Sequence, residues 1–90
     1  MYLMLKIDEL LDEREKTHGD FTLNAHVGQE LRTVFRRHSG NHSEVVRECL
    51  EHIATKLARI CTGDALEPDH WRDLQGYAGL ALKDCHDHKS

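Results

Sequence analysis

The 90-residue chain contains one proline, two phenylalanines, two tyrosines, one tryptophan and no long apolar run. The scarcity of proline leaves few positions at which a helix would be interrupted. No apolar run approaches the roughly 20 residues that cross a bilayer. The N-terminal segment is apolar only briefly and then turns acidic, which argues against a signal peptide. We therefore expect a cytoplasmic protein without a membrane partner.

Cysteine and positive charge are also limited. The three cysteines are an odd number and fall within helical patterns, which argues against a disulfide framework. The net charge of −4 gives no electrostatic reason to bind nucleic acid or anionic lipid. The chain forms a single domain over residues 1–90, and its small core predicts a homo-oligomer, because a partner would bury more apolar surface.

The apolar residues recur at three- and four-residue spacing and show no alternating strand pattern. Helices are expected over about 3–16, 21–37, 41–62 and 68–85, with a frayed tail at 86–90. Turns at Gly19, Gly40 and Gly63 separate them. Because the linkers are short, consecutive helices should pack as antiparallel neighbours. The sequence thus predicts an all-α bundle of about four helices.

Several residues refine this prediction. Asn41, followed three positions later by Glu44, resembles a capping box and should begin the third helix. Pro68 suits the first turn of the fourth helix. Gly76 and Gly79 would allow a neighbouring helix to approach the fourth one closely.

Two stretches, "EKTHGDF" and "KLARICTGDALEPDHWRDLQGYAGLAL", resemble a family of small phage and prophage proteins of unknown function. The resemblance covers roughly residues 10–83. The shared features are the Gly19–Asp20 turn, the Lys56 and Arg59 pair, and an aspartate-rich helix start followed by Gly–Tyr–Ala at 76–78. The resemblance implies a phage context, and hence the host cytoplasm, but no particular chemistry.

The chain is also distantly similar to the all-α nucleoside triphosphate pyrophosphohydrolases of the MazG type. Those enzymes hold magnesium with acidic residues on two consecutive helices. The corresponding residues here would be Glu44, Glu48, Glu51, Asp69 and Asp73. Magnesium prefers several oxygen ligands at one point, so these carboxylates would have to converge.

Helical periodicity argues against this convergence. At about 100° per residue, the three glutamates lie opposite the apolar stripe of the third helix. Asp69 and Asp73 similarly lie opposite Trp71 and Leu74. Both acidic sets should therefore face outward from a helical hairpin, unless a second subunit brings them together. A solvated acidic face is the favoured interpretation.

A second candidate site is a repeated Cys-x-x-His pattern. It occurs as Cys49 with His52 and as Cys85 with His88. An antiparallel hairpin would bring the two pairs to the same end, where they could complete a tetrahedral zinc site. Core packing of the cysteines and solvation of the histidines is the favoured alternative.

A small ligand would be held by residues near the turns. The candidates are His18, Asp20, Lys56, Arg59 and Tyr77. Lys56 lies at the edge of an apolar stripe, so its ammonium needs a partner. Asp20, a helix C-terminal carbonyl or a bound phosphate could serve, and a structural ion pair is favoured over a ligand.

The sequence contains no nucleophile elbow and no glycine-rich phosphate loop. Together with the outward-facing acids, this absence favours a non-enzymatic protein without a cofactor, and the resemblance implies that it is a phage accessory protein. Such a protein would act by binding a host protein, for example a defence component, or a small nucleotide held between subunits. The alternative is a magnesium-dependent pyrophosphohydrolase that uses the five acids named above.

Overall fold

The computed structural model describes residues 2–89, without the side chains of residues 2–5, 15, 17, 18 and 89. This part of the chain consists of α1 (Tyr2–His18), α2 (Phe21–His38), α3 (Glu44–Thr62) and α4 (Pro68–Lys89). Residues 2–89 include no strand, which confirms the prediction of an all-α fold with four helices. Helix α4 begins at the predicted proline and continues to Lys89, so the expected frayed tail is helical up to that residue.

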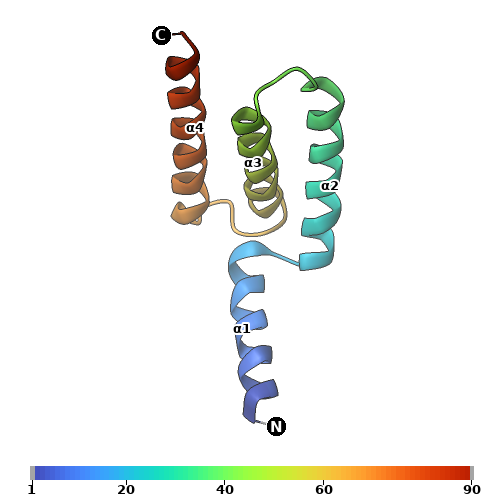
Figure 1. The fold of residues 1–90 in the computed structure, drawn as a ribbon. Helices are drawn as coiled ribbons and strands as arrows, with labels where there is room; N and C mark the ends of the chain where they lie inside the picture. The colour runs from blue at the N-terminus through green and yellow to red at the C-terminus, as the bar shows by residue number, and fades with distance from the viewer. Residues whose placement is uncertain (1, 90) are drawn as a thin grey trace.

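Three of the helices form a layer with α3 between α2 and α4 (Figure 1). Helix α2 packs on one side of α3 and α4 packs on the other, and within the described residues α2 and α4 make no contact. Both neighbours run antiparallel to α3, as their short linkers predict. Helix α1 departs from this pattern, because it extends away from the end of the layer (Figure 1). The molecule consequently measures 55 × 25 × 24 Å.

The turn between α1 and α2 rests on the end of α3. Gly19 has a φ of +79°, which favours glycine because it has no Cβ. A Cβ at this position would also collide with the Thr62 carbonyl and the Gly63 amide. Asp20 caps α2, with its side chain accepting a hydrogen bond from the Thr22 amide at 3.1 Å. The Gly–Asp turn thus fixes where α2 begins.

Helix α3 is capped by Ser43, not by the predicted Asn41. The Ser43 hydroxyl accepts a hydrogen bond from the Val46 amide at 3.1 Å. The same hydroxyl donates to Asp84 Oδ2 of α4 at 2.8 Å. The cap therefore also ties the start of α3 to the neighbouring helix, and this tertiary bond favours Ser43 over a residue with local capping propensity alone.

The contact between α2 and α3 is made by small residues. Ala54 and Ala58 of α3 are fully buried, and Gly28 of α2 lies against Ala58. The close contact predicted at Gly76 and Gly79 is absent within the described chain, since a Cβ at either position would meet no atom within 4 Å. The small side chains that matter for packing are therefore on α2 and α3, where they let the two backbones approach closely.

The buried apolar core is small, because Cys49, Ala54 and Ala58 are its only apolar members among the described residues. Most larger apolar side chains are half-buried or exposed along one side of the layer. We call this side the open apolar face. It comprises Leu23, Val27, Leu31 and Val34 of α2, Val46, Ile53, Leu57 and Ile60 of α3, and Trp71, Leu74, Ala78 and Leu82 of α4.

Candidate functional site

The opposite side of the layer is polar and carries two grooves, one on each side of the first half of α3. We call it the grooved polar face. The first groove lies between α2 and α3 and has a volume of about 470 Å³. The second lies between α3 and α4 and has a volume of about 590 Å³. Glu44 and Glu48 line both grooves, so the two form one continuous candidate site.

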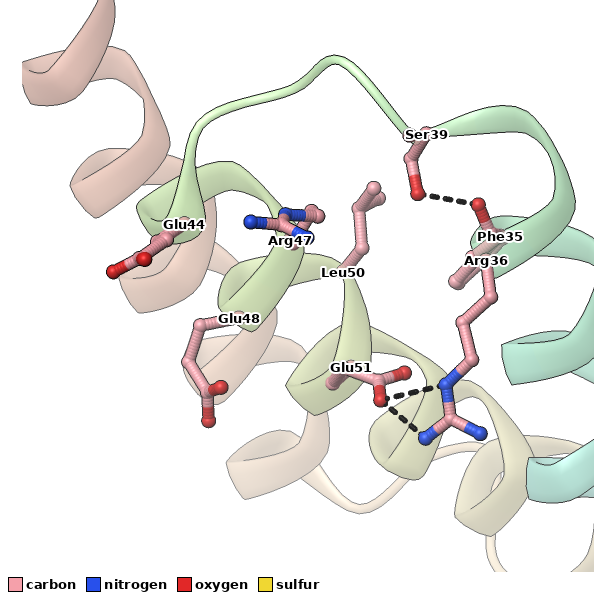
Figure 2. Close-up of a pocket in the computed structure, with 9 residues that line it drawn as sticks. Phe35, Arg36, Ser39, Glu44, Arg47, Glu48, Leu50 and Glu51 are labelled. Carbon is pink, nitrogen blue, oxygen red and sulfur yellow. Dashed lines mark hydrogen bonds and ion pairs between the residues drawn. The ribbon is translucent and has the colours of Figure 1, made fainter.

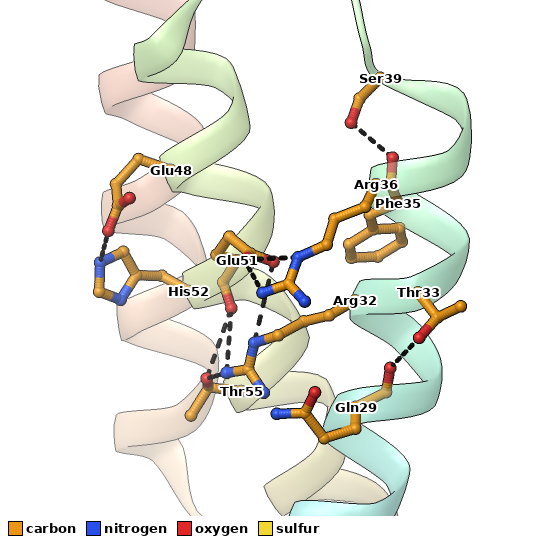
Figure 3. Close-up of polar contacts among 10 residues, drawn as sticks. All are labelled: Gln29, Arg32, Thr33, Phe35, Arg36, Ser39, Glu48, Glu51, His52 and Thr55. Carbon is orange, nitrogen blue, oxygen red and sulfur yellow. Dashed lines mark hydrogen bonds and ion pairs between the residues drawn. The ribbon is translucent and has the colours of Figure 1, made fainter.

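An arginine–glutamate cluster forms the wall of the first groove. Arg36 of α2 donates to Glu51 Oε1 of α3 from both Nε, at 3.1 Å, and Nη2, at 2.5 Å. Arg32 lies beside the same carboxylate and donates to the Thr55 hydroxyl. Figure 3 shows these side chains reaching across from α2 to α3. Two guanidinium groups on one carboxylate fix the position of Glu51.

Glu44 and Glu48 lie apart from this cluster. Figure 2 shows them extending from α3 on the side away from the Arg36–Glu51 pair. Glu44 makes no ion pair within the described residues, and Glu48 contacts only the His52 ring, with its Oε1 3.0 Å from Nε2. Both side chains are exposed. They are consequently accessible to a partner.

The second groove contains a stacked pair of rings. His52 of α3 and Tyr77 of α4 are nearly parallel, with their centroids 4.7 Å apart and an angle of 6° between planes. Asp84, which accepts from Ser43, closes one end of this groove. Lys83 and Asp87 also line it. The groove thus combines the stacked rings with four acidic side chains and one lysine, and the apolar side chains of Val45, Cys49 and Leu80 complete its lining.

The five acids considered for magnesium do not form one cluster in the single chain. Glu51 faces α2 and Asp73 faces α3, which differs from the outward orientation expected for both. Asp69 is exposed and pairs with Arg72 on its own helix at 3.1 Å. Among the side chains that the structure describes, no three of His, Cys, Asp or Glu are grouped so that they could hold a metal ion.

The partner of Lys56 is Asp73, with Nζ and Oδ2 2.6 Å apart. Only 13% of the Lys56 side chain is exposed, so the carboxylate compensates a largely buried ammonium. The hydrogen bond from Lys56 lowers the pKa of Asp73 below its ordinary value against the opposing effect of desolvation, and the charge of the Lys56 ammonium acts in the same direction as the hydrogen bond. This pair joins α3 to α4.

The other candidates for ligand binding are dispersed. Asp20 caps α2, and Tyr77 lines the second groove. Arg59 is half-buried on α3 and contributes to the positive charge near Asp73. The side chain of His18 lies outside the described residues. The structure therefore places only Tyr77 within the grooved polar face.

The two Cys-x-x-His pairs are likewise separate within the described chain. Cys49 is buried, whereas Cys85 is exposed. The His52 ring stacks on Tyr77, and His88 Nδ1 lies 2.9 Å from the Asp84 carbonyl oxygen. The two histidines therefore contact different neighbours.

Sequence reasoning did not identify four contributors to the grooved polar face. These are Arg32, Arg36, Ser43 and Asp84, which the sequence analysis does not single out. The four-residue spacing of the two arginines was the available signal, because it places both on one side of α2. The Ser43–Asp84 bond joins residues 41 positions apart, and no local pattern reveals it.

These features define an all-α protein built on a three-helix layer, with one polar and one apolar face. No helix within residues 2–89 has the length and apolar character needed to span a membrane. Compared with family models, curated proteins and solved structures, the chain has no match in any of the three.

Proposed function

We propose that this chain is a non-enzymatic protein that binds a basic segment of another protein on its grooved polar face. The observation that carries the proposal is that Glu44 and Glu48 are exposed and line both grooves. Two accessible carboxylates on adjacent helical turns would attract lysine or arginine side chains. The His52–Tyr77 pair would add a surface on which a guanidinium group can stack.

The charge of the site supports a protein partner over a nucleotide. The acidic side chains of the two grooves are Glu44, Glu48, Glu51, Asp84 and Asp87, whereas the basic ones are Arg36, Arg47 and Lys83. Arg36 is already paired with Glu51. A phosphate group would therefore meet an excess of negative charge. The resemblance to small phage proteins further supports a host protein in the host cytoplasm as the partner.

The alternative function is magnesium-dependent pyrophosphate release from a nucleoside triphosphate. One observation favours it, namely that Glu44, Glu48 and Glu51 all line the first groove. Asp69 and Asp73 lie outside both grooves, and Glu51 is held by arginines, so one chain supplies no complete set of magnesium ligands. A second subunit would have to provide the remaining acids.

The binding function can be tested with a fluorescent, lysine-rich peptide as the probe. We expect binding that weakens with added salt and becomes roughly tenfold weaker in the Glu44→Gln/Glu48→Gln double variant. The matched control is Glu9→Gln/Glu30→Gln, which removes the same charge from exposed positions outside the grooves. The proposal would be overturned if the wild-type protein does not bind the peptide, or if both double variants lose the same amount of peptide affinity.

A second assay tests the alternative function directly. Pyrophosphate release from a panel of nucleoside triphosphates is measured with and without magnesium, for the wild type and for Glu48→Gln. We expect no turnover above the protein-free rate. Metal-dependent turnover that Glu48→Gln abolishes would replace the binding function with hydrolysis.

A further inference from the structure

The open apolar face extends across all three helices of the layer. Helices α2 and α4 pack on nearly opposite sides of α3, so two opposite faces of α3 remain uncovered. Glu48 and Thr55 of α3 lie on one of them (Figure 3). Helical periodicity places the apolar residues of each helix on the other side. Within residues 2–89, neither α2 nor α4 covers that side of α3.

The amount of exposed surface is too large for a compact monomer. The accessible surface is 6963 Å². A folded monomer of 10.4 kDa is expected to expose about 5,400 Å², so the chain exposes about 1,600 Å² more. The radius of gyration, 15.8 Å, similarly exceeds the roughly 12 Å expected for a compact domain of 90 residues. The excess on one chain is about twice the 800 Å² that a standard interface buries on each partner.

Helix α1 contributes to this excess. It extends beyond the layer (Figure 1), and Ile7, Leu10 and Leu11 form an exposed apolar stripe along it. An isolated amphipathic helix of this length is marginal in water, because tertiary packing supplies most helical stability. The stripe therefore also needs a covering surface.

We infer that the open apolar face is covered by the same face of a second copy of this chain, which forms a twofold-symmetric dimer. Its twelve members are all apolar, so contacts between these residues of two copies would bury apolar surface without like-charge contact. The grooved polar face is acidic and would repel its own copy. An interface that buries all the excess surface would fall among the large, apolar interfaces of obligate homodimers.

This interface uses the side of the layer opposite to the proposed binding site. The dimer would therefore display two grooved polar faces outward, one from each copy. Because the two surfaces are distinct, loss of dimerisation and loss of peptide binding can be measured separately.

Helix α4 offers a matched pair of variants for the test. Leu82, on the open apolar face, is 58% exposed, and Leu80, beside the second groove, is 54% exposed. Each leucine is replaced by glutamate in a separate variant of the 90-residue chain. Sedimentation equilibrium then gives the dissociation constant of the dimer. We expect a wild-type dimer at micromolar concentration. Leu82→Glu should raise the dissociation constant at least roughly a hundredfold, since each twofold interface contains the change twice, whereas Leu80→Glu should leave it nearly unchanged.

Three outcomes would overturn the inference. They are a monomeric wild-type protein, equal effects of the two variants, and a Leu82→Glu protein that remains dimeric. Circular dichroism verifies that each variant is helical. If Leu82→Glu does not fold, Leu82→Gln replaces it, because it introduces a polar side chain without a charge. A Leu82 variant that is monomeric but still binds the lysine-rich peptide would separate this inference from the proposed function.

Discussion

The two sides of α3 are packed by different physical means. Toward α2, the contact consists of small residues, with Gly28 against Ala58 and an arginine–glutamate cluster at its edge. Toward α4, polar and aromatic contacts are prominent, including the Lys56–Asp73 ion pair and the Ser43–Asp84 hydrogen bond. The first contact depends on close approach of backbones, and the second depends on the charge state of its side chains. They should therefore respond differently to changes in volume and in pH.

This difference indicates why the chain can fold around so few large buried side chains. Alanine and glycine bury little apolar area, but they lose little side-chain entropy and bring two helices close together. The polar contacts between α3 and α4 depend on the orientation of the interacting groups and therefore fix the register of α4 against α3. Neither contact buries the large apolar residues, which remain available on the open apolar face.

The largest effect is expected from overpacking the contact between α2 and α3. Ala58 is 1% exposed and touches Gly28, so Ala58→Leu has no space for its additional atoms. We expect the free energy of unfolding to fall by about 1–3 kcal/mol, measured by urea denaturation.

The matched control for this substitution is Gly79→Ala on α4, where a Cβ would meet no atom of the chain within 4 Å. This variant should be stabilised by about 0.5–1 kcal/mol, because alanine favours the helix. If Ala58→Leu is as stable as Gly79→Ala, the close packing of α2 on α3 does not exist.

A smaller effect is expected from breaking the ion pair between α3 and α4. Asp73→Asn removes the partner of the largely buried Lys56 ammonium and should lower the melting temperature at neutral pH. The pKa of Asp73 is lowered by its hydrogen bond from Lys56. The contribution of the ion pair to stability is therefore fully present at pH values above the ordinary pKa near 3.8. It is lost as the pH falls through the lowered pKa of Asp73. The melting temperatures of variant and wild type should converge in acid.

The control for the ion pair is Asp69→Asn, which changes an exposed carboxylate one turn away on the same helix. It should alter the melting temperature much less at neutral pH, because a surface pair contributes little. If the melting temperature of Asp73→Asn lies below that of the wild type by the same amount from neutral to acid pH, loss of the ion pair is not the cause of the destabilisation.

The fold was largely predictable from the sequence, for local reasons. Helix periodicity, the glycine turns and Pro68 are local signals, and all four helices lie near their predicted positions. The direction of α1 was not predictable, because it depends on Gly19 resting against Thr62 at the far end of α3. The cap at Ser43 was missed for a similar reason, since Asp84 of α4 helps to select it.

The candidate site was less predictable than the fold. Periodicity correctly indicated that Glu44 and Glu48 are exposed, but it placed Glu51 with them. Glu51 lies only about 20° from Glu44 around the helix, and the wheel does not show that arginines from α2 can reach that side. The orientation of Asp73 was missed because Lys56 is 17 residues away and on another helix. Pairing between helices, rather than the character of single residues, determined these outcomes.

The smallest effect is expected at the end of the contact between α3 and α4, where Asp84 links Ser43 to His88. The hydrogen bond from His88 Nδ1 to the Asp84 carbonyl raises the pKa of His88, and the nearby Asp84 carboxylate raises it further. The stabilisation by protonated His88 is therefore complete at pH values below the ordinary pKa of 6.5. It is lost as the pH rises through the raised pKa of His88. His88→Gln should lower the melting temperature slightly at about pH 5.5 and should have no effect at about pH 8.5. A titration of the His88 ring followed by NMR measures the same linkage directly. A midpoint at or below that of an unstructured histidine would contradict this account of the Asp84–His88 contact.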